Sequence, residues 1–276
     1  MIRTLIPAPL RRAARHCRTQ LRNRRSITKL RWTGHPLAPT VADAIVGWQR
    51  GRPLAEDRID AVERQREQWL QNNTPLSEIA SGFNARDSIS RACRASLEPA
   101  WCPLMFHLAR SLRPHTTLEL GTNLGISSAY LATACRAHDG RVLTMEGSPA
   151  RQALAKSLHA ELQLDNIHYQ LGKFQDELPQ VLEQFQPIEL AFIDGHHQIK
   201  PTLEYVDAIY PAVRNPAVIV FDDICWSDDM IRAWEELCQD SRFEVMVSIG
   251  NIGIALTQEK VANRKPAVIE IIAKPG

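Results

Sequence analysis

Short apolar runs and longer amphipathic stretches follow one another in a regular order from residue 116 onwards. The apolar runs predict strands at five places, 117–120, 141–145, 167–171, 189–193 and 217–221. Around them, apolar positions recur every three or four residues and predict helices over 126–135, 149–162, 177–185, 203–209 and 229–238. Two last runs, 243–248 and 252–257, are separated by Ile249-Gly250-Asn251, which predicts a closing hairpin.

This alternation of strands and helices predicts an α/β fold. Units of this length imply a doubly wound, mostly parallel sheet of seven strands with helices on both faces. Residues 217–221 support this prediction, because an uninterrupted apolar strand is expected where both faces are covered. Ligands in such sheets bind beyond the carboxyl ends of the strands, so the residues that follow each strand are candidates for function.

The chain ahead of the first strand has a helical pattern of its own. Residues 40–73 predict two helices on either side of Gly51-Arg52-Pro53, and residues 88–112 predict further helix that is interrupted at prolines. We therefore divide the chain into a basic arm at 1–36, a helical extension at 37–112, a ligand-binding α/β domain at 113–260 and a C-terminal tail at 261–276.

Charge is distributed unevenly between the arm and the rest of the chain. The first acidic residue is Asp43, and residues 1–42 contain nine Arg and Lys29. The remaining 23 basic and 31 acidic residues give residues 43–276 a net charge of −8. A basic leader is thus attached to an acidic body.

Two interpretations of residues 1–31 stay open. One is a basic amphipathic helix, with Leu10, Ala14, Cys17 and Leu21 toward one side, that contacts an anionic membrane surface or nucleic acid. The other is a solvated and partly disordered arm, which we favour because the apolar side of such a helix is weak.

The cysteines and the apolar stretches point to a cytoplasmic protein. Six cysteines form no C-x-x-C pair and show no spacing typical of zinc ligands, which favours a reduced, intracellular protein. No window approaches 18 consecutive apolar residues, and arginines interrupt the first residues too early for a signal peptide.

The run Glu119-Leu120-Gly121-Thr122-Asn123-Leu124-Gly125 combines the end of a strand, a glycine turn and the start of a helix. Such a corner gathers backbone N–H groups and a helix N-terminus, which hold an anionic or polar ligand group. A dinucleotide fingerprint requires a middle glycine where this chain has Asn123. The carboxylate of Glu119 also favours a ligand with a cationic or amino group over a pyrophosphate.

The second and third predicted strands end in residues suited to a nucleoside. Glu146-Gly147 closes the second strand, and a carboxylate there accepts hydrogen bonds from both ribose hydroxyls. After the third strand, Phe174 either lies against an adenine ring or belongs to the core, and Gln175 is placed to bind the edge of the ring.

Three carboxylates and a histidine follow the fourth and fifth predicted strands. Asp194, Asp222 and Asp223 would repel one another unless a cation neutralised them, and oxygen ligands of this kind suit Mg²⁺ or Mn²⁺. His197 is placed to take a proton from a hydroxyl bound nearby, and Lys200 is a weaker alternative base. The competing interpretation is that these acids cap helices or contact a cofactor amine, and that the histidines are polar surface.

With these motifs, residues 91–257 resemble the class I S-adenosylmethionine-dependent methyltransferases, in particular the metal-dependent O-methyltransferases that act on catechols and macrolide sugars. The resemblance implies a Rossmann-like fold, Mg²⁺ or Mn²⁺ bound by Asp194, Asp222 and Asp223, and His197 as the base. It also implies that S-adenosylmethionine is bound by Glu119, Gly121, Thr122, Gly125, Ser127, Glu146, Gly147, Phe174, Gln175 and Asp194. The chain departs from the family at Phe174, where a small polar residue is common, and at Asp223, where the catechol type has Asn.

The expected activity is methyl transfer to a hydroxyl of a small molecule such as a sugar or a phenol. A metal-independent methyltransferase is the alternative among enzymes, and a non-catalytic cofactor-binding regulator or scaffold tethered by the basic arm is the alternative from another class. Methylation of nucleic-acid bases is disfavoured, because the Asn/Asp-Pro-Pro-aromatic motif of those enzymes does not follow the fourth strand. Association into a homo-oligomer stays open.

Overall fold

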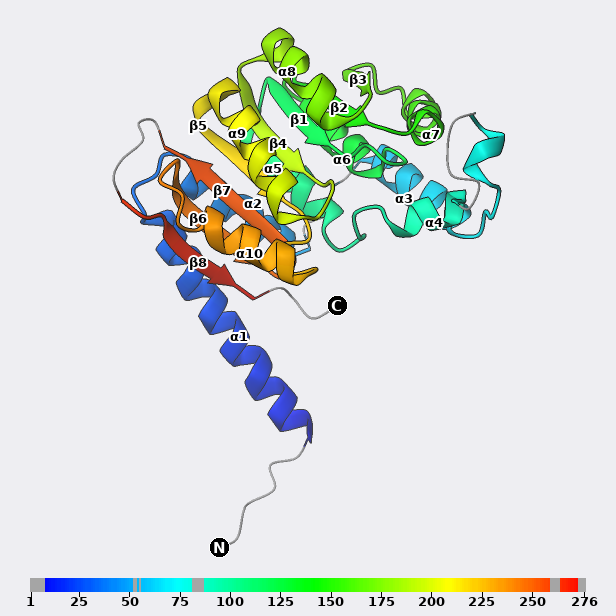
Figure 1. Cartoon of the computed structure of the whole chain (residues 1–276). Coiled ribbons are helices and arrows are strands. Elements are labelled where there is room, and N and C mark those ends of the chain that lie inside the picture. The colour runs from blue at the N-terminus through cyan, green and yellow to red at the C-terminus, as the bar shows by residue number, and fades with distance from the viewer. Residues whose placement is uncertain (1–7, 52–53, 55, 81–86, 259–263, 273–276) are drawn as a thin grey trace, which may run out of the picture.

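A computed structural model describes residues 8–51, 54, 56–80, 87–258 and 264–272, and of residues 8–18 it describes the backbone only. Within these ranges, eight strands form one sheet and helices pack on both of its faces (Figure 1). The strands are β1 (Thr116–Leu120), β2 (Arg141–Glu146), β3 (Ile167–Leu171), β4 (Ile188–Ile193), β5 (Val213–Phe221), β6 (Phe243–Ile249), β7 (Ile252–Thr257) and β8 (Ala267–Ile271). The α-helices are α1 (Ala8–Arg31), α2 (Ala38–Gln49), α3 (Asp57–Leu70), α4 (Ile89–Arg94), α5 (Cys102–Leu112), α6 (Ile126–Arg136), α7 (Pro149–Glu161), α8 (Phe174–Phe185), α9 (Ile199–Ile209) and α10 (Asp228–Leu237).

The strand order across the sheet is β3-β2-β1-β4-β5-β7-β6-β8. Strands β1 to β5 are mutually parallel, and β7 runs antiparallel to both β5 and β6. The chain therefore starts in the middle of the sheet, winds outward to β3, returns beside β1 and continues to β5. This order confirms the doubly wound α/β class, and it places the ends of β1, β2 and β4 next to one another.

The edge of the sheet corrects two sequence-based expectations. β8 pairs in parallel with β6, so the sheet has eight strands and not seven, and residues 267–271 of the expected tail at 261–276 are its outermost strand. The sequence did not reveal this strand because its pattern of apolar and polar residues is only five residues long and because the strand packs against a helix that is distant in the chain. The expected residues 261–263 and 273–276 of the tail lie outside the described residues.

That distant helix is α1, whose second half lies along β8 (Figure 1). The side-chain amide of Asn23 accepts a hydrogen bond from the N–H of Ile272 (2.9 Å) and donates one to its carbonyl (2.8 Å). Arg22 adds an ion pair to Glu270 (2.6 Å). Residues 8–31 of the basic arm thus form a helix, contrary to the partly disordered arm that we favoured.

The side of α1 that contacts the body is not the apolar side named from the sequence, whose contact with a membrane or nucleic acid stays a prediction. Ile27 and Leu30 are buried, whereas Leu21 is 56% exposed. The side chains of Leu10, Ala14 and Cys17 lie outside the described part of the chain.

Two hydrophobic clusters fill the space on the two faces of the sheet. One face packs against the N-terminal extension and helices α6 and α7, and the other packs against α8, α9 and α10. The alternation of inward side chains along the strands produces this division: Val218 and Val220 belong to the first cluster, and Ile219 and Phe221 to the second. The sheet is therefore covered on both sides, as its apolar strands require.

Helices α2 to α5 form the N-terminal extension beside α6. Trp48 of α2 stacks on Trp101 at the start of α5, with ring centroids 5.2 Å apart. Glu63 of α3 accepts a hydrogen bond from the hydroxyl of Tyr130 in α6 (2.8 Å). Glu63 also forms an ion pair with buried Arg66, and Arg66 in turn donates a hydrogen bond to the carbonyl of Leu97. The extension is therefore fastened to the α/β domain by polar contacts as well as by its apolar core.

None of the helices in the described ranges is both long enough and apolar enough to cross a membrane. The described cysteines, Cys93, Cys102, Cys135, Cys225 and Cys238, are all free thiols.

Candidate active site

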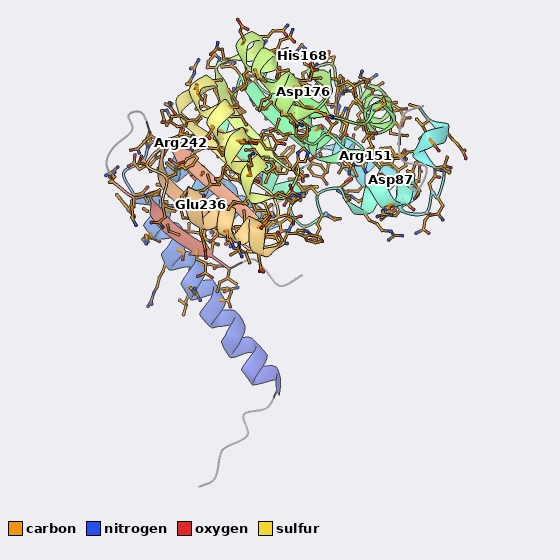
Figure 2. All side chains as sticks on the ribbon, viewed as in Figure 1. Asp87, Arg151, His168, Asp176, Glu236 and Arg242 are labelled. Atoms are coloured by element: carbon orange, nitrogen blue, oxygen red, sulfur yellow. The ribbon has the colours of Figure 1, made fainter. Side chains whose placement is uncertain are left out.

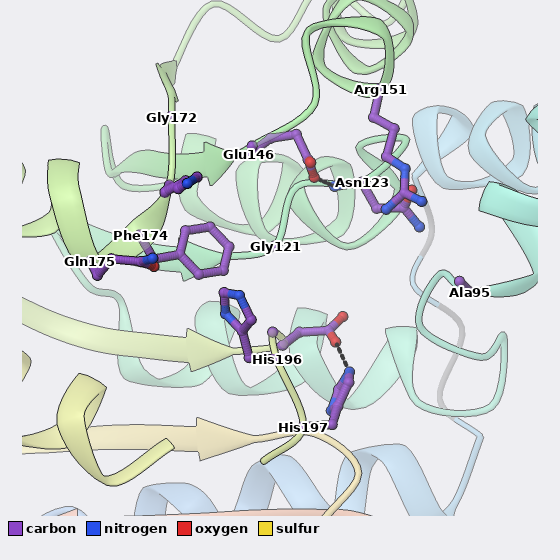
Figure 3. A pocket seen from close by; sticks show the side chains of 14 residues that line it. Ala95, Gly121, Asn123, Glu146, Arg151, Gly172, Phe174, Gln175, His196 and His197 are labelled. Carbon is purple, nitrogen blue, oxygen red and sulfur yellow. Dashed lines mark hydrogen bonds and ion pairs between the residues drawn. The ribbon is translucent and has the colours of Figure 1, made fainter. Parts of the chain in front are cut away.

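A pocket of about 610 Å³ lies beyond the carboxyl ends of the central strands (Figure 3). Seven of the predicted site residues line it, namely Gly121, Glu146, Gly147, Phe174, Gln175, Asp194 and His197. The expected convergence of strand ends at one crevice is thereby present. Glu119, Thr122, Gly125, Ser127, Asp222 and Asp223 are predicted site residues that do not line it.

The glycine turn between β1 and α6 forms the floor of this pocket. Gly121 has φ +108°, and a Cβ at this position would lie 2.0 Å from the carbonyl oxygen of Asp194. The N–H groups of Gly121 and Thr122 both donate to the carbonyl of Met145 at 3.0 Å. Only glycine allows β1 and β4 to approach this closely at the turn.

A buried histidine supports the turn from behind. His159 Nε2 lies 2.7 Å from the carbonyl oxygen of Gly125, and His159 Nδ1 lies 2.8 Å from the hydroxyl of Tyr169. Because a carbonyl can only accept, Nε2 carries the proton and Nδ1 accepts from the tyrosine. Burial lowers the pKa of His159 to about 4, so the neutral form that this arrangement needs prevails at neutral pH.

Glu119 lies behind the turn, fully buried at the end of β1. Its Oε2 accepts hydrogen bonds from the hydroxyls of Ser128 and Thr144, while its Oε1 has no partner among the described residues. Burial raises the pKa of Glu119, and the nearby hydroxyls of Ser127 and Ser128 oppose that effect. Glu119 and Ser127 thus stand next to the turn instead of lining the pocket.

Glu146 at the end of β2 is held in place by the backbone. Its Oε2 accepts the N–H of Asn123 (Figure 3) and its Oε1 accepts the N–H of Ser148, each at 2.8 Å. Each carboxylate oxygen retains a further lone pair, and the residue lines the pocket. This is the arrangement that a carboxylate needs to receive the two hydroxyls of a ribose.

Phe174 is compatible with both interpretations that the sequence left open. It is 8% exposed and packs edge-on against Tyr205 and His196, with centroids 5.7 Å apart in each case. It also lines the pocket, because α8 begins at Phe174 and not at residue 177. Its ring lies so close to Gly195 that a Cβ there would be 2.6 Å away.

His197 stands between two carboxylates at the other end of the pocket. Its Nε2 is 3.5 Å from Asp194 Oδ1, and its Nδ1 is 3.9 Å from Asp223 Oδ2. Burial lowers the pKa of His197, and Asp223 opposes that effect. The imidazole is therefore suited to be neutral near pH 7 and able to accept a proton.

The three carboxylates predicted to bind a metal are crowded but do not converge on one point. Burial raises the pKa of Asp194 well above its usual range, with Asp222 adding to the effect, and burial together with Asp223 raises the pKa of Asp222 to about 7. Asp222 Oδ1 accepts the N–H of Asp223 at 2.9 Å. Within the described ranges, no group of three or more His, Cys, Asp or Glu side chains is arranged to hold a metal ion.

Several residues that line the pocket are not among the predicted site residues. Asn123, Arg151 and Ala95 lie along the side that faces the N-terminal extension, and Gly172, Lys173, Gly195 and His196 complete the lining. The positive φ of His196 (+62°) and His197 (+32°) shows that this loop has a constrained backbone. The pair of adjacent histidines was the available signal for His196, whereas Arg151 gave none.

Comparison with known proteins agrees with this geometry. Residues 118–224 match the model of a family described as a methyltransferase domain. A protein of Mycobacterium sp. (strain JLS) that is named as a predicted O-methyltransferase is 27% identical over 165 residues, which are 59% of this chain. The match spans 63% of the length of that relative.

Two solved structures share the architecture. An O-methyltransferase from Bacillus cereus in complex with S-adenosylhomocysteine has a TM-score of 0.55 at 18% identity, with 75% of this chain and 93% of that chain covered. The O-methyltransferase TomG from Streptomyces achromogenes in complex with S-adenosylmethionine has a TM-score of 0.52 at 23% identity, with 70% and 99% covered. Residues 118–224 therefore match a methyltransferase domain, and the chain shares the fold of these two solved structures.

Proposed function

We propose that the chain is an S-adenosylmethionine-dependent O-methyltransferase that acts on a hydroxyl of a small molecule such as a sugar or a phenol. The observation that carries the proposal is that one pocket contains both Glu146, a backbone-held carboxylate suited to a ribose, and His197, a base suited to a hydroxyl. The 27% identical relative from Mycobacterium sp., which is named as a predicted O-methyltransferase, supports the reaction type.

The cofactor would lie across the glycine turn. Glu146 would bind the ribose hydroxyls, and Phe174 and Gln175 would contact the adenine where α8 begins. Because Gly121 adds no side chain, the nucleoside can approach the backbone closely. The carboxylate of Asp194, on the same side as His197, favours the positive charge of the sulfonium.

His197 would start the transfer by accepting the proton of the acceptor hydroxyl. As the oxygen forms its bond to the methyl carbon, the bond from that carbon to sulfur breaks, and its electron pair turns the sulfonium into a neutral thioether. The products are a methyl ether, S-adenosylhomocysteine and a protonated His197, which Asp194 and Asp223 stabilise at 3.5 and 3.9 Å. Holding both reactants in one pocket supplies the required alignment.

Asp194, Asp222 and Asp223 are the residues that would hold a divalent cation. A cation at this place would contact the acceptor oxygen and lower the pKa of the hydroxyl. The described side chains do not form a ligand group as they stand, so no step above depends on a cation. A metal-independent methyltransferase is accordingly the second candidate, and it is favoured by the contacts that these carboxylates make with His197 and with the backbone.

The decisive experiment is calorimetric titration of S-adenosylhomocysteine into wild type and Glu146→Ala, each with Mg²⁺ and with a chelator. Loss of two ribose hydrogen bonds predicts at least a tenfold weaker binding in the variant, at about 1.4 kcal/mol per factor of ten. Glu161→Ala, which removes an exposed carboxylate at the end of α7, is the control and should bind as wild type does.

Turnover on a panel of hydroxylated sugars and phenols completes the test. Methyl transfer that persists in chelator selects the metal-independent form, and transfer that returns only with Mg²⁺ selects the metal-dependent one. Unchanged affinity in Glu146→Ala would contradict the ribose assignment, and cofactor binding without turnover would favour a regulator or scaffold.

A further inference from the structure

One side of the pocket is formed by the N-terminal extension and not by the methyltransferase domain. Ala95, which follows α4, lines the pocket opposite the ends of the central strands (Figure 3). We call residues 87–96 the pocket wall. Two side chains of the domain reach out to this wall, and both line the pocket themselves.

The first of them is Asn123, in the middle of the glycine turn. Its Nδ2 donates to the carbonyl of Ala92 at 2.8 Å and to the hydroxyl of Ser96 at 3.1 Å. Its backbone N–H donates to Glu146, so one residue joins the ribose carboxylate to the wall. Asn123 also has φ +47°, a conformation that costs an L-residue free energy and that the hydrogen bonds help to offset.

The second is Arg151, in the first turn of α7. Its Nη2 lies 2.6 Å from Oδ2 of Asp87 at the start of the wall, and the two side chains are 28% and 16% exposed. Figure 2 shows this pair at the end of the molecule where α3, α4 and α7 meet. Arg151 lines the pocket, whereas Asp87 does not. An effect of Asp87 on the pocket must therefore pass through Arg151 or the wall.

The wall is itself part of the extension. The N–H of Leu76 donates to the carbonyl of Asp87 at 2.9 Å, and the N–H of Ser90 donates to the carbonyl of Asn72 at 2.7 Å. Movement of the wall away from the pocket would have to break the contacts of both Asn123 and Arg151.

We propose that Asn123 and Arg151 are positioning residues that hold the pocket wall against the cofactor, so that the N-terminal extension sets how tightly and for how long the cofactor is retained. This inference rests on the proposed function, since it assumes that the pocket receives S-adenosylmethionine. The contacts act at opposite ends of the wall, so loss of either one loosens it and loss of both frees it.

The test uses the full chain in four forms: wild type, Asp87→Ala, Asn123→Gly and the double variant. Asn123→Gly removes the amide but suits the positive φ and keeps the N–H that binds Glu146. Amide hydrogen exchange of residues 89–96 is measured without ligand, and the affinity and dissociation rate of S-adenosylhomocysteine are measured by calorimetry and stopped flow. Each single variant should exchange faster in the wall and bind about tenfold more weakly, mainly through faster dissociation.

Two variants serve as controls. Asp165→Ala removes the partner of Arg136 in an ion pair of 2.7 Å far from the wall, and it should change neither measurement. Asp87→Glu keeps the carboxylate and should retain most of the wild-type affinity. If Asp87 acted only through the packing of its side chain, the longer glutamate would not be expected to restore the affinity.

The outcomes separate this inference from the proposed function. Unchanged exchange and unchanged affinity in Asp87→Ala and Asn123→Gly would overturn the inference while cofactor binding by wild type upheld the function. Wild type that binds no S-adenosylhomocysteine would overturn both the proposed function and the retention role. Equal losses in Asp165→Ala would also overturn the inference, because they would show a general effect of removing charge.

Discussion

The carboxylates at the two ends of the pocket have opposite surroundings. At the cofactor end, Glu146 receives a backbone N–H on each oxygen, so its charge is met by the fold itself. At the acceptor end, burial and mutual repulsion raise the pKa values of Asp194 and Asp222, and the contacts of Asp194 and Asp223 to His197 are long. The carboxylate at the first end is stabilised by hydrogen bonds, whereas the carboxylates at the second end are destabilised in their charged form by burial and by one another. The unfavourable charge therefore lies at the end of the pocket where we propose that methyl transfer occurs.

Gly121→Ala is expected to have the largest effect, because the new side chain at the cofactor end would clash with backbone atoms that cannot move aside. The new Cβ would lie 2.0 Å from the backbone oxygen of Asp194, at φ +108°. We expect a loss of about 2–5 kcal/mol in the free energy of unfolding and no measurable cofactor binding. Denaturant unfolding and calorimetry measure the two effects.

Gly147→Ala is the matched control for the effect of Gly121→Ala on the free energy of unfolding. It also lines the pocket, but the nearest atom to a new Cβ is 3.8 Å away. A stable, cofactor-binding Gly121→Ala protein would show that the close approach of β1 and β4 is not required.

His197→Gln is expected to affect the acceptor end alone. Loss of a general base lowers kcat by roughly 100-fold to 10,000-fold, while affinity for S-adenosylhomocysteine stays unchanged. Steady-state kinetics and calorimetry separate the two quantities. The exposed His168→Gln is the control, and a loss in kcat that it shares would contradict a specific role for His197.

His159 links the cofactor end to pH. Its pKa is lowered to about 4 in the folded chain, so the unfolded chain binds a proton more readily below its ordinary pKa of about 6.5. Folding stability should therefore fall as the pH drops from about 6.5 to 4, by up to about 3 kcal/mol from this residue. Urea unfolding at pH 7 and pH 4.5 should show a smaller pH dependence in His159→Gln, and an identical dependence would contradict this assignment.

Asp222→Asn should have the smallest effect, and unlike Gly121→Ala it should raise the stability of the fold. Removing a buried, repelled carboxylate is expected to raise the Tm at pH 8 by about 2–4 °C while activity falls. Thermal unfolding measures the gain. Asp176→Asn, a change of an acid in the first turn of α8, provides the comparison at another site. A lowered Tm in Asp222→Asn would mean that this carboxylate stabilises the fold.

Local patterns in the sequence predicted the part of the site that is built from strand ends. Gly121, Glu146 and Asp194 each follow an apolar strand, and parallel strands necessarily bring their ends together. The contacts of Asn123 and Arg151 with the pocket wall could not be predicted in the same way. They join residues that are 31 and 64 positions apart, and nothing in either local pattern specifies the partner. Long-range pairing of polar side chains depends on packing that only the folded chain reveals.

The outer edge of the sheet has a consequence for biosynthesis. α1 is made early, but the backbone groups of Ile272 that bind Asn23 lie 249 positions later in the chain. Until β8 emerges from the ribosome, the edge of β6 is exposed and the contact side of α1 has no strand to cover. We therefore expect nascent chains that stop before β8 to depend on chaperones and to aggregate more readily than completed ones.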